Sequence, residues 1–311
     1  MRVLFWGTPE FATPPLRALL GEGFEVVGVV TQPDRPVGRS RSKLEPSPVK
    51  QIAVEENIPV LQPEKPRGDA EFLNAVRKLE PDTSIVVAYG NLLSKELIDL
   101  PKRGTLNIHA SLLPAFRGAA PIQASILGGL AETGVTIMRM VPKLDAGPIV
   151  HQLTTPIADD ETGGELTLRL SELGALALIE ALALMEAGAA KEREQDESRA
   201  TYAGKIDRDT TRIDWNRPAI EVARQIRAFD PRPGAWTTHR GADLKVFGAR
   251  HMRSLHSAGP GTVTVIDGNG MAVACREGEV QVLSLQPAGK RRLTPAELGN
   301  SRGIALGERL S

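Results

Sequence analysis

Asn107, His109 and Asp145 are the residues of this chain whose types and spacing could carry out chemistry. Asn107 and His109 lie two residues apart at the end of the apolar run TLNIH, so on an extended chain both side chains point to the same side. Asp145 follows a later apolar run, in the tight loop LDAGP. An amide can donate to a developing oxyanion, an imidazole can transfer a proton, and a carboxylate can orient the imidazole.

The surrounding residues favour a ligand site over a purely structural histidine, which is the more common role of a lone histidine near a strand end. Ser111–Pro114 and then Phe116–Gly118 predict an irregular loop carrying two leucines that it cannot easily bury. Open α/β sheets bind ligands at the carboxyl ends of their strands, where this loop is expected. For Arg117 two roles stay open: contact with a carboxylate or phosphate of a ligand, or the capping of a helix.

The first half of the chain alternates short apolar runs with amphipathic stretches. The runs are rich in β-branched residues and predict strands at 2–6, 24–30, 84–88, 105–109 and 135–140. Helical patterns lie between and after them, at 11–20, 47–56, 69–79, 119–129 and 163–188. This alternation predicts an α/β domain, with a Rossmann-like parallel sheet covered by helices on both faces.

The composition and the hydrophobic periodicity of the sequence change after residue 189. Residues 190–205 are charged and lack periodicity, so they predict a linker. One helical pattern at 218–229 is followed by short, Gly-rich strands, and the turn sequence at 267–270 (DGNG) predicts a β-hairpin. We therefore expect a catalytic domain over 1–189, the linker over 190–205, and a smaller β-barrel or sandwich domain over 206–311.

Composition and missing motifs exclude several classes of protein. Of the 311 residues, 41% are hydrophobic and 24% charged, which is ordinary globular usage. The single cysteine, Cys275, excludes a disulfide framework and a Cys-rich metal site, and we expect no metal. The first turn, GTPEF, lacks the three glycines that bind a dinucleotide. No apolar run reaches the ~18 residues of a membrane span and no secretory signal is evident, so we expect a cytoplasmic protein.

The strings NIHASLLPAFRGAAPI, ETGVTIMRM and LDAGP together resemble the folate-dependent formyltransferases. The resemblance extends over nearly the whole chain through FWGTPEFA, TQPDRPVGR, YAGKI and IRAFDPRPGAWT. Of these strings, TQPDRPVGR and IRAFDPRPGAWT are most similar to the branch of the family that acts on a charged tRNA. Two positions depart from the family's pattern, Asn91 and Gly204, and neither belongs to the Asn, His and Asp set.

The resemblance implies a reaction and a set of site residues. A formyl group would pass from 10-formyltetrahydrofolate to the α-amine of methionine carried by initiator tRNA, in a monomer that needs no metal. Asn107 and His109 would stabilise the oxyanion, and Asp145 would act as a base or orient His109. The folate would contact two strand-end segments, Val87, Ala88, Tyr89 and Gly90 in the first, and Ser111, Leu112, Leu113 and Pro114 in the second.

Basic residues indicate where a tRNA would bind. Residues 205–311 carry 17 Lys/Arg against 11 Asp/Glu in a chain of zero net charge, which suggests a polyanionic partner, although chance variation of surface charge is the alternative. The family implies an oligonucleotide-binding (OB-like) barrel there. A basic, Pro-punctuated loop at 31–50 is suited to phosphates, although an ordinary solvated loop is the simpler reading. The residues expected to contact tRNA are Arg35, Arg39, Arg41, Lys43, Lys290, Arg291 and Arg292.

Other activities on the same scaffold stay open from the residues alone. A hydrolase of 10-formyltetrahydrofolate, or a formyltransferase with a small-molecule acceptor such as an amino sugar nucleotide, would keep the same three polar residues. Such enzymes would not need the basic loop at 31–50. An RNA-binding module with a vestigial cleft would bind RNA without turnover.

Overall fold

A computed structural model of the chain describes residues 1–37, 43–254, 257–300 and 303–311. The described residues form two compact units, and neither is continuous in sequence. The first comprises Met1–Gly118, Thr133–Thr155 and Thr167–Tyr202, and the second comprises Ala119–Glu132, Pro156–Leu166 and Ala203–Ser311. The boundary between the two units therefore falls after Tyr202, inside the expected linker, and most of that linker belongs to the first unit.

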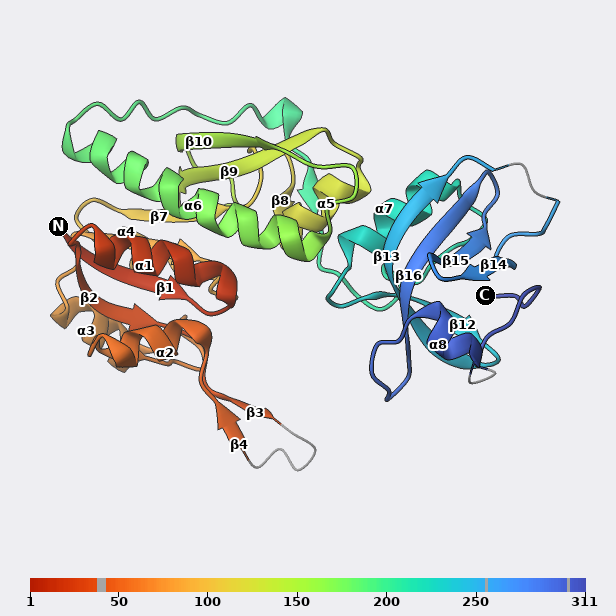
Figure 1. Ribbon diagram of the computed structural model, residues 1–311. Coiled ribbons are helices and arrows are strands. Elements are labelled where there is room, and N and C mark those ends of the chain that lie inside the picture. Colours follow the sequence, from red (N-terminus) through yellow and green to blue (C-terminus); the bar gives the residue numbers. More distant parts are fainter. Residues whose placement is uncertain (38–42, 255–256, 301–302) are drawn as a thin grey trace. The chain divides into compact units, whose positions relative to one another are not determined.

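Within the described residues, seven strands of the first unit form one sheet in the order β10-β9-β7-β6-β1-β2-β5 (Figure 1). The ladders between β7, β6, β1, β2 and β5 are parallel, whereas β9 runs antiparallel to β7. The predicted α/β sheet is confirmed, with this mixed edge as the difference. The strands are β1 (Arg2–Gly7), β2 (Glu25–Val30), β5 (Val60–Leu61), β6 (Thr83–Val87), β7 (Thr105–His109), β9 (Glu132–Arg139) and β10 (Ile149–Pro156).

Helices bury both faces of this sheet. Leu4 and Trp6 alternate along β1 and pack with residues of α3 and α4 in one buried cluster. On β7, Ile108 contacts α6, where a Cβ at Gly174 would lie 3.1 Å from its methyl group. Because neighbours on a strand point to opposite faces, Asn107 and His109 point away from α6. The helices are α1 (Thr13–Gly21), α2 (Pro48–Glu55), α3 (Ala70–Lys78), α4 (Lys95–Asp99) and α6 (Gly163–Glu186), with short 3-10 turns η1 (Glu10–Ala12) and η2 (Glu197–Arg199).

Two small strand pairs lie outside the main sheet. β3 (Arg35–Val37) and β4 (Lys43–Glu45) form an antiparallel pair that extends away from the sheet (Figure 1). β8 (Arg117–Gly118) pairs with β11 (Tyr202–Ala203), which lies within the expected linker. These pairs, β5, β10 and α4 were not predicted, because each is too short or too irregular to show a period in the sequence.

The second unit contains a five-stranded antiparallel sheet, in the order β12-β13-β16-β15-β14 among the described residues. The predicted hairpin at 267–270 is confirmed, since Asp267 pairs with Gly270. The strands are β12 (Ala235–His239), β13 (Ala242–Met252), β14 (Val263–Asp267), β15 (Gly270–Ala274) and β16 (Glu279–Pro287), and the helices are α5 (Pro121–Leu127), α7 (Ala219–Ala228) and α8 (Pro295–Asn300).

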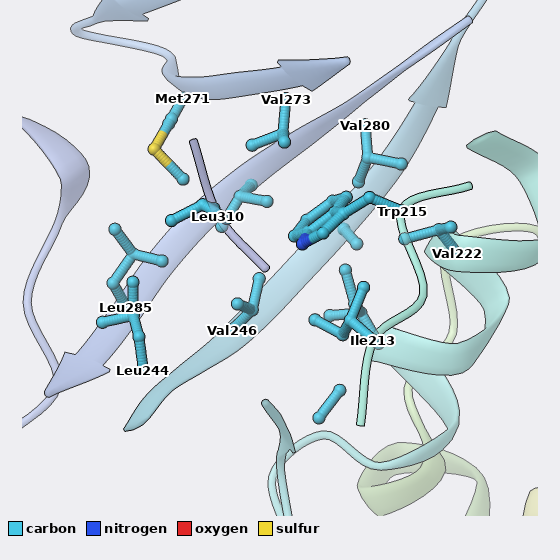
Figure 2. Close-up of a cluster of buried hydrophobic side chains, with 14 of the residues drawn as sticks. Ile213, Trp215, Val222, Leu244, Val246, Met271, Val273, Val280, Leu285 and Leu310 are labelled. Carbon is cyan, nitrogen blue, oxygen red and sulfur yellow. The ribbon is translucent and has the colours of Figure 1, made fainter. Parts of the chain in front are cut away.

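The C-terminal residues close the edges of this antiparallel sheet. Ser311 exchanges two backbone hydrogen bonds with Thr238 on β12, and Val263 on β14 is bonded by Gly307 and Glu308. Both edge strands are thereby paired with one segment, which gives the sheet a barrel-like closure. Leu310 packs within this closure, beside Trp215 and Val246 (Figure 2).

None of the helices in the described ranges is long and apolar enough to cross a membrane.

The closure makes Leu310 a stability determinant of the second unit. Its side chain is 1% exposed, so Leu310→Ala is expected to cost about 2–5 kcal/mol through the lost apolar contacts and the cavity. Leu306, which is 62% exposed, is the matched control, and Leu306→Ala is expected to change stability by less than about 0.5 kcal/mol. Urea unfolding followed by tryptophan fluorescence measures both variants, and equal midpoints would contradict this role of the C-terminal residues.

Candidate active site

Asn107 and His109 lie at the carboxyl end of β7, in the middle of the main sheet. Asn107 is in register with Val86 on β6 and Met138 on β9, so ladders on both sides fix the backbone. In the described part of the chain, the side-chain amide of Asn107 has no hydrogen-bond partner, which leaves its donors available to a ligand. His109 is buried, and its Nε2 lies 2.9 Å from the carbonyl oxygen of Phe116. Because a carbonyl only accepts, this contact requires a proton on Nε2.

The carboxylate of Asp145 faces the other nitrogen of the same ring. Its Oδ2 lies 3.7 Å from Nδ1 of His109 and accepts a 2.8 Å hydrogen bond from the backbone N–H of Gly118. Asp145 has a φ of +47°, a left-handed conformation that is uncommon outside glycine. Asp145 lies far from His109 in the sequence, and the structure brings the two side chains to 3.7 Å.

The loop that carries Asp145 approaches the end of β9 very closely. A Cβ at Gly147 would lie 1.9 Å from the carbonyl oxygen of Arg139, so only glycine fits there. The string LDAGP therefore places its glycine where backbone meets backbone, two residues after the carboxylate.

The predicted folate loop at 111–114 is held from beneath by Thr136 on β9. The Thr136 hydroxyl donates to the carbonyl of Ser111 at 2.6 Å and accepts from the N–H of Leu113 at 3.1 Å. Leu113 is buried against Met138 and Ile149, whereas Leu112 and Pro114 are half-buried. The structure thus hides one of the two leucines and leaves the other partly accessible.

The second predicted folate segment follows β6. Val87 and Tyr89 are buried, and the Tyr89 ring packs edge-on against Trp6. Burial raises the pKa of Tyr89 to about 12, so the phenol stays neutral. Ala88 and Gly90 are exposed and have positive φ values of +47° and +95°. Any ligand contact at this strand end would therefore involve the backbone of Ala88 and Gly90 rather than the Tyr89 ring.

The residues predicted to bind tRNA have diverse environments. Arg35 is exposed at the start of β3, Arg39 and Arg41 lie outside the described residues, and Lys43 begins β4. On the second unit Lys290 is exposed, and Arg291 pairs with Glu297 at 3.1 Å.

Arg292 is placed differently from its neighbours, since its guanidinium stacks 3.5 Å from the centre of the Phe247 ring and pairs with Asp230. Arg291 and Arg292 are therefore already engaged within the unit.

Sequence reasoning missed the contribution of residues 190–202 to the site. Gln195 contacts the backbone of the Asp145 loop, and Glu197 pairs with the buried Arg117 at 3.0 Å. In the structure the guanidinium of Arg117 is therefore engaged by Gln195 and Glu197. This charged stretch has no hydrophobic period, and the residues that it contacts, such as Arg117, are distant in the sequence. The sequence therefore contains no signal of its role.

Among the described residues, no three His, Cys, Asp or Glu side chains gather closely enough to hold a metal ion.

A mostly parallel α/β sheet with an amide, an imidazole and a carboxylate at one strand end, joined to an antiparallel-sheet unit, is the architecture of a group-transfer enzyme of the formyl transferase kind. The chain belongs to the formyl transferase family. The family's "Formyl transferase" domain matches residues 1–182, and its "Formyl transferase, C-terminal domain" matches residues 205–303.

Curated relatives match the chain from end to end. A protein of Methylococcus capsulatus named methionyl-tRNA formyltransferase is 46% identical over 310 residues, which cover 100% of this chain and 99% of the relative. A protein of the same name from Pseudomonas fluorescens is 48% identical over 302 residues, which cover 97% of this chain and 94% of the relative.

A solved structure shares the fold at lower identity. HypX from Aquifex aeolicus, crystallised in complex with tetrahydrofolic acid, superposes with a TM-score of 0.65 at 20% identity. The match covers 96% of this chain and 47% of HypX, so this chain spans about half the length of that protein.

The exposed carboxylate of Glu197 makes acid stability a test of these contacts. Hydrogen bonds from Arg117 and then Lys143 lower the pKa of Glu197 from 4.5 to about 2. A carboxylate with a lowered folded-state pKa stabilises the fold above its unfolded pKa and loses that contribution as the pH falls toward the folded value. Glu197→Gln is therefore expected to flatten the decline of stability between about pH 4.5 and pH 2, measured as urea midpoints against pH.

Lys143→Met serves as the graded comparison, because it removes only the second cause and should flatten the decline in part. An unchanged decline in the Glu197→Gln protein would contradict the assignment.

Proposed function

We propose that this chain acts as a methionyl-tRNA formyltransferase, transferring the formyl group of 10-formyltetrahydrofolate to the α-amine of methionine on initiator tRNA. The observation that carries the proposal is the placement of His109 between the Phe116 carbonyl and the Asp145 carboxylate, beside the Asn107 amide. This constellation lies in a chain that is 46–48% identical, over its whole length, to relatives of that name. We assign catalysis to the first unit and part of the tRNA contact to the second, OB-like unit.

In this proposal Asn107 and His109 stabilise the charge that develops during the reaction. The α-amine of methionine attacks the formyl carbon, and negative charge develops on the formyl oxygen. The Asn107 amide stabilises that charge as a fixed donor does in an oxyanion hole, and His109 stabilises it by its positive charge when the ring is protonated. Their rigid positions on β7 mean that the two side chains need not reorganise during the reaction.

Asp145 stabilises the positive charge of the protonated imidazole and assists its proton transfer. A carboxylate beside an imidazole stabilises the ring when it carries a positive charge. With Nε2 already protonated, Nδ1 is the atom of His109 that can accept a proton, and it faces Asp145 at 3.7 Å. Asp145 and His109 thereby help to move the amine proton toward the folate nitrogen that leaves.

The strand-end backbone fits a flat, polar folate ring. The exposed peptide groups of Ala88 and Gly90 offer donors and acceptors at the end of β6, and the half-buried Leu112 and Pro114 offer apolar surface. Ser111 supports this surface indirectly, since its hydroxyl donates to the carbonyl of Ala115 at 2.6 Å. The family membership and the tetrahydrofolic acid bound by HypX support a tetrahydrofolate donor.

The β3–β4 hairpin is the proposed tRNA contact of the first unit. Its base is anchored by Asp34, which accepts from Lys50 at 2.7 Å and from Gln62 at 2.8 Å. These bonds lower the pKa of Asp34, with the Lys50 bond as the larger cause. Because these bonds already fix the base of the hairpin, binding of phosphates would cost little conformational entropy there.

The proposed reaction is tested with three acceptors in parallel: methionyl initiator tRNA, free methionine and an amino sugar nucleotide. We expect formylation of the tRNA alone. Asn107→Ala should lower kcat by about 10²–10³-fold, the typical effect of removing one oxyanion donor. His109→Ala should abolish transfer, and His151→Ala, which removes a histidine paired with Glu180 elsewhere in the same unit, is the control. Transfer to the sugar nucleotide, or release of formate without an acceptor, would contradict the tRNA assignment.

The hairpin contributes to binding rather than to chemistry. Arg35→Ala and Arg39→Ala are expected to raise KM for tRNA, leave kcat within about twofold, and reduce the dependence of binding on salt by up to ~0.9 in the log–log slope per lost phosphate contact. The control is Arg17→Ala, which removes an exposed cation of α1. An unchanged KM and salt slope in both variants would argue for a merely solvated loop.

A further inference from the structure

A buried arginine lies directly behind the Asp145 loop. The Arg117 side chain is 0% exposed, and a buried guanidinium is costly unless its donors are all paired. Its Nε and Nη2 donate to Oε1 of Gln195 at 3.1 and 2.8 Å, and its two terminal nitrogens donate to Glu197 at 3.1 and 3.0 Å. These partners come from residues 190–202, which belong to the first unit although the sequence predicts a linker there.

Gln195 passes this contact on to the loop of Asp145. Its Nε2 donates to the carbonyl oxygens of Asp145 and Gly147, both at 2.8 Å. Its Oε1 is occupied by two donors from Arg117, and its Nε2 by two acceptors, so only one orientation of the amide satisfies all four partners. Arg117 therefore fixes the polarity of Gln195, and Gln195 in turn binds the loop only as a donor.

The backbone of Asp145 needs such support. A φ of +47° for a residue other than glycine persists only where the surroundings hold it. The carboxylate is held by the Gly118 N–H, and the carbonyl of the same residue is held by Gln195. Two bonds from separate segments thus set both the side chain and the main chain of Asp145.

We propose that Gln195, oriented by Arg117, is a positioning residue that holds the Asp145 carboxylate at its working distance from His109. Gln195 touches no reacting group and acts through the Asp145 backbone. The inference rests on the proposed formyl transfer, because the catalytic role of Asp145 belongs to that proposal. It also gives the segment leading into the second unit a part in setting the geometry of catalysis.

Gln195→Glu separates positioning from simple packing. The carboxylate keeps the volume of the side chain and can still accept from Arg117, but it has no donor for the two loop carbonyls. Gln195→Met is the second variant, which keeps the approximate volume and has neither donor nor charge. Glu194→Gln, an exposed neighbour in the same segment, is the matched control.

Steady-state kinetics with 10-formyltetrahydrofolate and methionyl initiator tRNA, together with thermal unfolding, test the proposal. We expect kcat to fall at least tenfold in Gln195→Glu and Gln195→Met, with KM for both substrates within about twofold of wild type, while Glu194→Gln matches wild type. If Gln195→Glu fails to fold, Gln195→Met gives the same reading.

A kcat within twofold of wild type in a folded variant would overturn the positioning role. A loss of activity that only follows the unfolded fraction would overturn it as well, because it would indicate packing alone. Inactivity of the wild-type protein toward the charged tRNA would instead contradict the proposed function, so the two failures are distinguishable.

Discussion

The hydrogen bond from the Gly118 N–H to the Asp145 carboxylate, beside His109, is the constraint on which the geometry of the candidate site depends. It joins the loop after β7 to the loop after β9, two strands that are neighbours in the sheet. Because β9 runs antiparallel to β7, the end of β9 lies beside Leu106, near the start of β7, and the loop that follows must return toward His109 before Asp145 meets it. The bare backbone of Gly147 then lets the second loop lie directly on the end of β9. The sheet, the loops and the carboxylate form one connected arrangement.

Not all of the positive charge in the second unit is available to a ligand. Although residues 205–311 carry a net positive charge, several of their arginines are engaged within the unit. Arg292 lies on Phe247, and Arg208 stacks 3.9 Å from the Trp236 ring while pairing with Asp243. Such arginines pack on aromatic rings and pair with carboxylates of the same unit, so only part of the excess charge is free to follow a phosphate backbone.

The sequence predicts the elements whose hydrophobic residues recur at a helix or strand period. It does not predict the segments whose structure depends on contacts with residues distant in the chain. The amphipathic patterns at 47–56 and 218–229 became α2 and α7 almost at their predicted ends, because one helix face alone determines such a pattern. The placement of Asn107 and His109 on the same side of β7 likewise follows from the alternation of side chains along a strand. Segment 190–202 could not be predicted, since its role rests on Arg117, which is some 78 residues away from Gln195 in the chain. The antiparallel β9 is likewise set by the short connection before it and its ladder to β7, not by its composition.

The protonation of the His109 ring tests the arrangement at the centre of the site most directly. The ¹⁵N spectrum of the histidine side chains at alkaline pH, where imidazoles are neutral, assigns the tautomer when it is compared with the spectrum of the His109→Gln protein. Because Nε2 lies 2.9 Å from the Phe116 carbonyl, we predict a proton on Nε2 and an unprotonated Nδ1 facing Asp145. A proton on Nδ1 in the neutral ring would contradict this geometry, since Nε2 would then face a carbonyl with no hydrogen to donate.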